Sequence, residues 1–395
     1  MDSSKQKNLL LEKMVELLEL PNSAYEKAKD RYVDIGEYLG REKSACHDND
    51  PHIFPQGSFR LGTAIRPLDE SEEYDLDLAC NLSCGISHGT HSQADVKQLI
   101  GGEVKSYREA RNIKAPVKDK HRCWRLEYED HMSFHIDIVP CIPADASRQI
   151  SLRESMLASG QDRVLSEDVS HHAVSITDDR HPEYRQISPN WNISNPEGYA
   201  QWFESRMHVE SGIFLREAQI DDLPLYRRKT PLQRSIQLLK RHRDQMFKDD
   251  QDVKPISVII TTIAARSYSG QTSLEIALQE ILNELKRFAD SGSTIVLNPV
   301  NPEENFADRW TMPQYEHLRL RENFAAWATQ VHIDFATLVT SRNMSFLAEL
   351  AARKLSIRPT ALELGTLIGV SVSPAIHSAK SHEIPEDSAK PWQVR

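Results

Sequence analysis

The chain has 395 residues, of which 39% are apolar and 27% are charged, and it contains only 15 Gly and 20 Pro. This length indicates two or three structural units, and this composition excludes a disordered or fibrous chain. The net charge of −10 argues against binding to a long nucleic acid. Two local clusters are nevertheless basic, namely residues 97–125 and 227–243. They suit a compact polyanion such as a nucleoside triphosphate, or else they are solvated helix faces.

No segment has the length expected of a membrane span. The longest strongly apolar stretch, Pro255 to Ala265, is about half as long as the roughly 20 residues that a span requires, and the N-terminal residues are polar. The five cysteines are an odd number scattered along the chain, which argues against a disulfide framework. We therefore expect a cytoplasmic protein without membrane contact.

Residues 5–45 predict two helices. The second has a single apolar stripe with steps of three and four residues, formed by Tyr25, Ala28, Tyr32, Ile35 and Leu39. Asn22 and Ser23 offer side chains that could cap its start. We expect both helices to brace a sheet.

From Ile53 to Pro143 the pattern changes to short segments of period two, which indicate a sheet with at least one intervening helix. The segments are YDLDLACNL, CWRLEYED and FHIDIVPCI. The polar stretch from Ala144 to Asn195 contains several Pro and Asn and predicts a long irregular crossover.

The remainder predicts a mainly helical unit. The expected helices are Glu197–Gly212, Thr230–Lys248, Pro255–Tyr268, Ser273–Ser291, Tyr315–Thr340 and Ser345–Leu355. Thr230 followed by Pro231 is typical of a helix start. We expect the division to be 1–195 for the N-terminal helices and catalytic lobe, 196–372 for the helical lobe and 373–395 for a flexible tail.

Three aspartates form the strongest chemical signal. Asp75 and Asp77 lie two residues apart on a predicted strand, so both point to one face while the leucines between and after them point to the other. Adjacent carboxylates repel one another, and a divalent cation relieves that repulsion. Asp137, inside a second apolar strand, could complete a site for two magnesium ions. Alone, the two-aspartate strand could also be an exposed, charged sheet edge.

Gly57 and Ser58 add a second part to this picture. If Ser58 opens a helix, free backbone N–H groups and its hydroxyl could hold phosphate oxygens beside the metals, and Gly57 lets the backbone come close. Gly-Ser is also common in ordinary turns. The combination of both features in one chain favours the functional interpretation.

A zinc site is a weaker alternative elsewhere in the sequence. Cys80, Cys84, His88 and His91 have ligand side chains, but Cys80 ends a predicted core strand, where a buried thiol is ordinary. No Walker A, zinc-protease or nucleophile-elbow motif is present in the sequence.

The motifs GSFRLGT, YDLDL and HIDIV resemble the signature of the polymerase-beta-like nucleotidyltransferase superfamily. More closely, PQGSFRLGTAIRP, SNPEGYAQWF, PLQRSIQLLKRHRD and NPVNPEENFADRW resemble the bacterial CD-NTases, relatives of cyclic GMP-AMP synthase and oligoadenylate synthetase that act in anti-phage CBASS systems. The resemblance covers about residues 20 to 355 and is closest to the group called clade D. The interval from Ser58 to Asp75 is longer than in many relatives.

The resemblance implies an α+β fold, with a polymerase-beta-like lobe built on a mixed β-sheet and a C-terminal helical lobe. It implies metal-dependent transfer of nucleoside monophosphates from NTPs, ATP among them, to ribose hydroxyls, ending in a cyclic di- or trinucleotide that contains adenine. Asp75, Asp77 and Asp137 would be the catalytic ligands of two Mg²⁺ ions, with Mn²⁺ as a substitute.

The resemblance also assigns nucleotide-binding residues. Gln56, Gly57 and Ser58 would hold the donor triphosphate. Lys240 falls where relatives place a triphosphate-binding lysine, and Ser257 falls near a serine that contacts the donor.

Two other functions stay open from the sequence. One is a nucleotidyltransferase that modifies a protein, a small molecule or an RNA end; the other is a non-catalytic nucleotide-binding subunit, which has no need of three carboxylates. The tail SHEIPEDSAKPWQVR contains Trp392, and a large aromatic in a polar tail suits a partner protein. The resemblance implies a CBASS regulatory protein as that partner.

Overall fold

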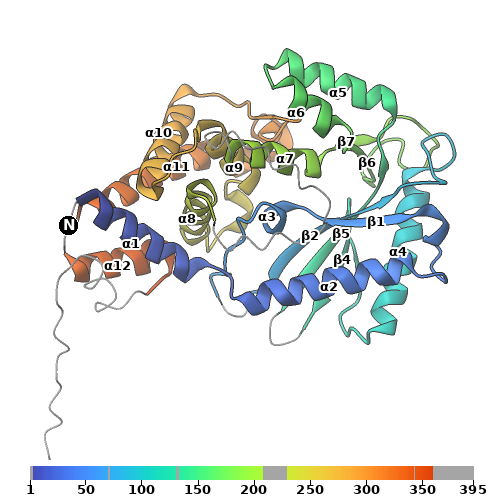
Figure 1. Cartoon of the computed structure of the whole chain (residues 1–395), viewed down its shortest axis with the longest axis horizontal. Helices are drawn as coiled ribbons and strands as arrows, with labels where there is room; N and C mark the ends of the chain where they lie inside the picture. The colour runs from blue at the N-terminus through green and yellow to red at the C-terminus, as the bar shows by residue number, and fades with distance from the viewer. Residues whose placement is uncertain (1–2, 70–71, 130–132, 208–228, 342, 359–395) are drawn as a thin grey trace, which may run out of the picture.

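The computed structural model describes residues 3–69, 72–129, 133–207, 229–341 and 343–358. A seven-stranded sheet with flanking helices lies beside a group of helices (Figure 1). Its strands are β1 Pro51–Pro55, β2 Tyr74–Leu82, β3 Lys118–Asp119, β4 Trp124–Tyr128, β5 Phe134–Pro143, β6 Val174–Ile176 and β7 Asn192–Ser194. The order is β1-β2-β5-β4-β3, with β6 on β5 and β7 on β6. Because β2 and β5 are parallel and the other pairs antiparallel, the sheet is mixed, as expected.

The alternation along β2 sets the two faces of the sheet. Leu76 and Leu78 are fully buried, and they pack in one core with α2 (Asn22–Gly40) and α4 (Gln93–Ala110). Burying each leucine contributes about 1.5–3 kcal/mol relative to exposure, which fixes the register of the strand. Asp75 and Asp77, which alternate with these leucines along the strand, therefore point to the opposite face.

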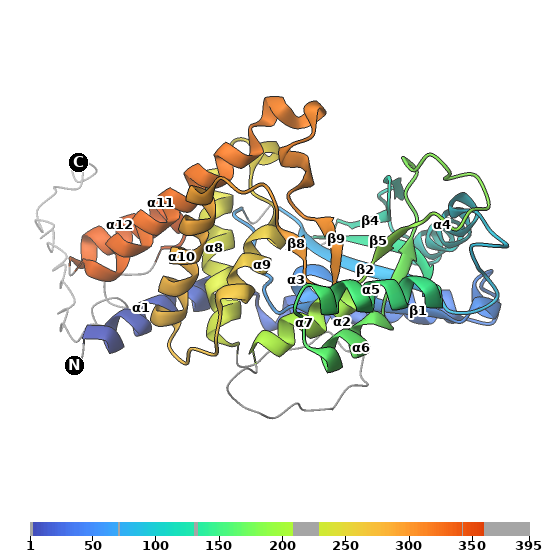
Figure 2. The same cartoon turned by 90° about the horizontal axis from the view of Figure 1, so that it is seen from above.

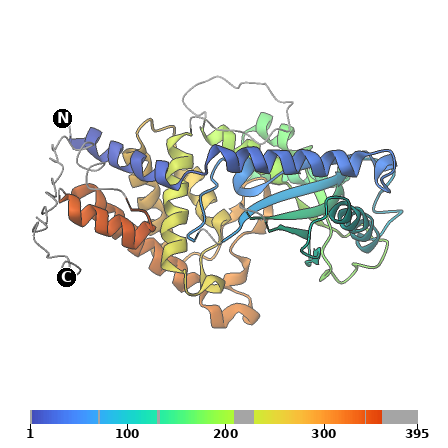
Figure 3. The same ribbon diagram turned by 90° about the horizontal axis from the view of Figure 1, so that it is seen from below.

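The first helix corrects one prediction. Helix α1 (Ser3–Leu18) does not brace the sheet, since Leu11, Met14 and Leu18 are buried in the core of the helical group. Figure 3 shows this helix running beside the helical group, away from the strands, and only α2 continues across the sheet. The apolar residues of α1 indicate that one face of the helix is buried, but they do not indicate which neighbouring element covers that face.

The start of α2 also differs from the prediction. The N-cap residue is Pro21, with no side-chain capping bond, and Asn22 is already helical. Because proline holds φ at −64° here and its ψ of 149° is extended, the helix can begin directly after it. The apolar stripe of α2 is confirmed, as all five of its residues are buried.

The prediction of an irregular crossover from Ala144 to Asn195 is wrong. This stretch contains α5 (Ala146–Ala158) and α6 (Arg163–Ser170), followed by β6 and β7. Asp145 and Asp162 cap the two helices through their side chains. In α5 only Leu152 and Met156 are buried, so the helix lacks the repeating apolar stripe by which a sequence predicts it.

The helical group largely follows the prediction. Its helices are α7 Pro196–Met207, α8 Pro231–Met246, α9 Ser257–Ser267, α10 Leu274–Ser291, α11 Leu320–Thr340 and α12 Met344–Leu355. Thr230 caps α8 as expected, by accepting a hydrogen bond from the Gln233 backbone. The helix expected from Tyr315 begins instead as a 3-10 turn, Pro313–Leu318, because Arg319 is left-handed with φ 48°. The short hairpin β8–β9 (Leu297–Asn298, Asn301–Asn305) is not predicted by the sequence.

Some predictions lie outside the described residues. These are the end of the helix expected to reach Gly212, the C-terminal part of the helical lobe from residue 359, and the tail 373–395 with Trp392. Among the described helices, none combines the length and the apolar character needed to cross a bilayer.

Candidate active site

Three carboxylates meet at the centre of the sheet. Asp77 on β2 stands directly opposite Asp137 on the parallel neighbour β5, and Asp75 precedes it on the same face. One oxygen from each of the three lies within 4.8 Å of the others. The predicted convergence of Asp75, Asp77 and Asp137 is therefore observed.

The electrostatics of this cluster suit a cation. Burial, followed by the charges of Asp75 and Asp137, raises the pKa of Asp77 to about 8. The anionic form of Asp77 is thus costly unless positive charge is nearby. The three grouped ligand side chains are all carboxylates, and carboxylate oxygens favour hard, oxygen-seeking divalent cations. The donor set consequently fits the metal ions implied for the family.

Two basic side chains that sequence reasoning missed touch the cluster. Arg125 on β4 donates two hydrogen bonds of 2.7 Å to the two oxygens of Asp137. His135 lies between two acids, with Nε2 2.9 Å from Asp75 Oδ1 and Nδ1 3.2 Å from Glu73 Oε2. Strand alternation places Arg125 on the polar face of β4. The pairing of Arg125 with Asp137, however, depends on the β4–β5 register, which no local pattern gives.

The Gly57–Ser58 turn packs directly against these carboxylates. Gly57 begins the short helix α3 (Gly57–Arg60) with φ +64°, and a Cβ added there would overlap Asp77 Oδ2. Glycine is therefore required both for the backbone angle and for the space. Ser58, the next residue, is half-buried in the first turn of α3.

Gln56 is bonded to the sheet. It is the N-cap residue of α3 but makes no side-chain cap. Its backbone N–H donates to the Asp77 carbonyl at 2.9 Å, and its side-chain amide donates to the Leu78 carbonyl at 3.3 Å. Gln56 thus ties the turn to β2.

Lys240 is neither solvated nor paired with an acid in the contacts that the structure describes. Its side chain is 7% exposed, and Nζ donates to the Thr63 carbonyl at 3.0 Å. Burial, with a smaller contribution from Arg243, lowers the pKa of Lys240 to about 8. The interpretation of α8 as a solvated basic face is wrong, because Lys240, Arg241 and Arg243 are all buried.

Ser257 begins α9, as the prediction of a helix there requires. Its hydroxyl accepts a 2.7 Å hydrogen bond from Arg243 Nη1, which also donates to the Pro255 carbonyl at 3.1 Å. In this structure, then, Lys240 and Ser257 both form hydrogen bonds with protein groups, and the charge of Asp75 partly offsets the lowering of the Lys240 pKa.

The other candidate site does not assemble. Within the described residues, Asp75, Asp77 and Asp137 are the one group of three or more such side chains close enough to hold a metal ion, and the four zinc candidates are not gathered. Cys80 is buried, Cys84 is exposed, His88 Nε2 lies 2.9 Å from Ser175 Oγ and His91 Nδ1 lies 2.9 Å from Thr90 Oγ1. All five cysteines are free thiols.

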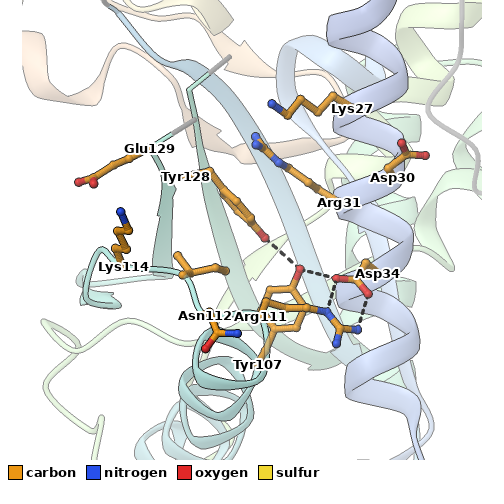
Figure 4. Close-up of a pocket in the computed structure, with 11 residues that line it drawn as sticks. Lys27, Asp30, Arg31, Asp34, Tyr107, Arg111, Asn112, Lys114, Tyr128 and Glu129 are labelled. Carbon is orange, nitrogen blue, oxygen red and sulfur yellow. Dashed lines mark hydrogen bonds and ion pairs between the residues drawn. The ribbon is translucent and has the colours of Figure 1, made fainter. Parts of the chain in front are cut away.

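A cavity of about 580 Å³ lies on the other face of the sheet (Figure 4). Tyr128 lines it from β4 and is three residues from Arg125, so the two side chains point to opposite faces. Within it, Asp34 accepts two hydrogen bonds from Arg111 and one from the Tyr107 hydroxyl. The sheet therefore separates this cavity from the three carboxylates.

Residues 51–141 match the family model described as "Cyclic GMP-AMP synthase DncV-like, nucleotidyltransferase domain". A c-di-GMP synthase of Roseivirga ehrenbergii is 27% identical over 83% of this chain and 78% of its own length. The chain is therefore similar to bacterial CD-NTases over most of its length. A second similar protein, the cyclic dinucleotide synthase CdnG of Bradyrhizobium diazoefficiens, is 24% identical over 76% of this chain and 69% of its own length.

Solved CD-NTases share the fold. CdnG of B. diazoefficiens in complex with GTP superposes with a TM-score of 0.62 at 18% identity, covering 92% of this chain and 98% of its own. CdnC of E. coli MS115-1 with ATP gives 0.57 at 14% identity, covering 90% and 99%. The polymerase-beta-like nucleotidyltransferase fold with its helical C-terminal part, expected from the sequence, is thereby confirmed.

Proposed function

We propose that the protein transfers nucleoside monophosphates from NTPs to ribose hydroxyls and closes the product into a cyclic oligonucleotide. The observation that carries this proposal is the contact between the Gly57–Ser58 turn and Asp77, which puts a phosphate-binding turn beside three converging carboxylates. The matched relatives named as cyclic dinucleotide synthases support the same reaction.

Each part of the site has a role in this proposal. Asp75, Asp77 and Asp137 would hold two Mg²⁺ ions, with Mn²⁺ as a substitute. Such ions activate the attacking hydroxyl and stabilise the departing pyrophosphate. Ser58 and the free N–H groups at the start of α3 would bind the donor triphosphate. Arg125 holds the two oxygens of Asp137 in a fixed orientation.

Gln56, Lys240 and Ser257 complete the proposed donor site. Gln56 anchors the turn to β2 through the Leu78 carbonyl. Lys240 has three N–H donors and gives one to Thr63, so it can also donate to a phosphate oxygen. Ser257 would contact the donor from the start of α9. A triphosphate beside Lys240 would favour its charged form and reverse the depression of its pKa.

The product is proposed to be a cyclic di- or trinucleotide. The sequence resemblance implies adenine. The c-di-GMP synthase among the relatives, and the solved CdnG complex with GTP, support guanine as a second candidate base. Labelled ATP, GTP, CTP and UTP, supplied singly and together, would separate these products by mass spectrometry.

The same assay tests the reaction itself. Purified protein with NTPs and Mg²⁺ alone should give a cyclic product, because the NTPs serve as both donor and acceptor. Product formed only after addition of a protein, a small molecule or an RNA would identify the modifying enzyme instead. Nucleotide binding without any product would support the non-catalytic subunit.

We further infer two functional lobes, residues 1–195 and 196–372, with the exception that α1 packs with the second. The tail 373–395 is proposed to bind a regulatory protein in anti-phage defence, and a solved CdnC–HORMA complex supports such partners in the family. Deleting residues 381–395 should leave NTP turnover within about twofold and abolish a complex with the partner. Lower activity of the isolated truncated enzyme would contradict this role.

A further inference from the structure

Arg60 connects the Gly57–Ser58 turn to α7. It is the last residue of α3, two positions after Ser58. Its Nε and Nη2 donate to the two oxygens of Glu197 at 2.9 and 2.7 Å, and its Nη1 donates to Glu204 at 2.5 Å. The Arg60 side chain is only 14% exposed. Figure 2 shows α3 beside α7, which belongs to the helical group.

The two glutamates are both placed for this contact, and Glu197 also accepts a hydrogen bond of 3.3 Å from the Gln201 side chain of the same helix. They are seven residues apart on α7, about two helical turns, so both lie on one face. Glu197 is in the first turn, where an acid could serve the helix dipole. Asn195 already caps that end, since its Oδ1 accepts from the Gly198 N–H at 2.9 Å. Glu197 is therefore available to hold Arg60 through a planar, two-bond contact.

Helix α8 fixes the chain that follows the turn. The Gln233 amide donates to the Leu61 carbonyl at 3.0 Å, and the Gln237 amide donates to the Ala64 carbonyl at 2.8 Å. These bonds act beyond residue 60. Within α3 itself, Phe59 is buried against Tyr25 and Phe134 on the sheet side, and Arg60 is the residue whose side chain ties the helix to α7.

We propose that Arg60 is a positioning residue for the donor nucleotide: by pairing with Glu197 and Glu204 it holds the turn that presents Ser58 to the triphosphate. The inference rests on the proposed function. Without Arg60, Gly57 still lies against Asp77 and Phe59 stays buried, but the hydrogen bonds that the structure describes between α3 and α7 are lost. The Ser58 hydroxyl and the N–H groups of the turn are then no longer held in one orientation toward the triphosphate.

A purely structural role for Arg60 makes a different prediction. An ion pair that only joins two elements would lower the melting temperature and the amount of active enzyme, which reduces kcat without changing nucleotide affinity. A positioning role raises KM for the NTP and the Kd of a non-hydrolysable NTP, because the folded variant binds the triphosphate less well.

The test compares Arg60→Leu with a matched ion-pair control, Arg41→Leu. Arg41 donates to Glu103 at 2.7 Å on the α2–α4 side of the sheet, away from Ser58. Titration with non-hydrolysable ATP and GTP should give a Kd about ten- to a hundredfold higher for Arg60→Leu. It should be unchanged for Arg41→Leu, even if both variants melt at lower temperature.

Graded variants keep the test decisive if Arg60→Leu fails to fold. Glu197→Gln weakens the two-bond contact and Glu204→Gln the single bond, so the Kd should rise more for Glu197→Gln than for Glu204→Gln. The exchanged pair Arg60→Glu with Glu197→Arg should recover part of the loss.

If the wild type makes product but Arg60→Leu and Glu197→Gln both keep its Kd and KM, the inference is overturned and the proposed function stands. A wild-type protein that binds neither nucleotide would overturn the proposed function together with the inference.

Discussion

The sheet side and the helical side of the candidate site behave differently. On the sheet, Asp75 and Asp77 share a face as their spacing predicts, and the register of β2 and β5 brings Asp137 to them. On the helices, Lys240 and Ser257 lie on the predicted elements but bond the Thr63 carbonyl and Arg243. On the sheet side the carboxylates are already close enough to hold a cation. On the helical side the candidate nucleotide-binding groups form hydrogen bonds with other parts of the protein.

The difference follows from how each element places a side chain. On a strand, residues two apart always share a face, and the register with a parallel neighbour fixes what stands opposite. On a helix, a lysine can reach several neighbours, so its partner depends on the loop that packs there. Here that loop follows Leu61, and α8 donates to its carbonyls from Gln233, Gln237 and Lys240.

The largest expected effect tests the sheet side. Asp77→Asn should reduce product formation at least about a thousandfold, because metal-ion stabilisation of several kcal/mol is lost. Mg²⁺ should raise the melting temperature of the wild type but not of the variant. Substantial product from the variant would contradict the metal-ligand assignment.

The same substitution has a pH signature without metal. Because Asp77 has a folded-state pKa of about 8 against an ordinary value of 3.8, the folded protein retains a proton that the unfolded chain has lost between these pH values. This contribution makes the wild type less stable as pH rises from about 4 to 8. Asn carries no such proton, so the melting temperature of Asp77→Asn at pH 8 should equal or exceed that of the wild type.

The second largest effect concerns the contact between the turn and the sheet. In Gly57→Ala the new methyl group would overlap Asp77 Oδ2, and φ +64° would be strained. Displacement of the turn should lower activity about a hundredfold. Gly36→Ala, inside α2, is the matched control, since a Cβ added at this position would have nothing within 4 Å. That control should keep full activity and gain about 0.5–1 kcal/mol of stability.

Much of the fold could be predicted because local pattern and burial agree. The stripe of α2, the alternation of β2 and the Thr230 cap of α8 each appear in the structure. Helix α5 could not be found in the same way, because only Leu152 and Met156 of its residues are buried. The place of α1 depends on a distant partner, α8, and a sequence stripe carries no information on that choice.

The residues of the candidate site also differ in whether a local sequence pattern could predict them. The shared face of Asp75 and Asp77 could be predicted from their spacing, whereas the place of Asp137 opposite Asp77 depends on the register of β2 and β5. Gly57 could be predicted as part of a turn proposed to bind phosphate. Arg125 could not, because its partner Asp137 depends on strand register. Arg60 could not, because Glu197 lies 137 residues later in the chain. Each missed residue acts through a contact between elements that are distant in the sequence.

The third prediction tests whether the helical side serves the nucleotide despite its present contacts. Lys240→Met should raise the Kd of a non-hydrolysable NTP about ten- to a hundredfold, the value of a charge-assisted contact of about 1.5–3 kcal/mol. Lys286→Met, at a half-buried position of α10 where the lysine pairs with Asp290, should leave the Kd unchanged. A change below about twofold for Lys240→Met would assign Lys240 to the Thr63 loop alone.

Lys240 also predicts a pH dependence of the nucleotide-free protein. Its folded-state pKa of about 8 is below the ordinary 10.5, so the unfolded chain binds more protons between these values. This contribution raises the stability of the wild type as pH increases from about 8 to 10.5. The Met variant should lack that rise, which thermal melting at several pH values would measure.

The smallest effect is expected at Ser257. Its hydroxyl accepts from Arg243 Nη1, and Ser257→Ala removes that acceptor together with any contact to the donor nucleotide. Arg243 keeps its bonds to Asp244 and to the Pro255 carbonyl, so the melting temperature should change little. Loss of one hydroxyl contact of about 0.5–1.5 kcal/mol should raise the Kd of the NTP about two- to tenfold. Ser267→Ala, at the other end of α9, removes only a bond to the Ala264 carbonyl of its own helix and should not change the Kd. Equal affinities for the two variants would show that Ser257 serves Arg243 and not the nucleotide, and would confine the donor contacts on the helical side to Lys240.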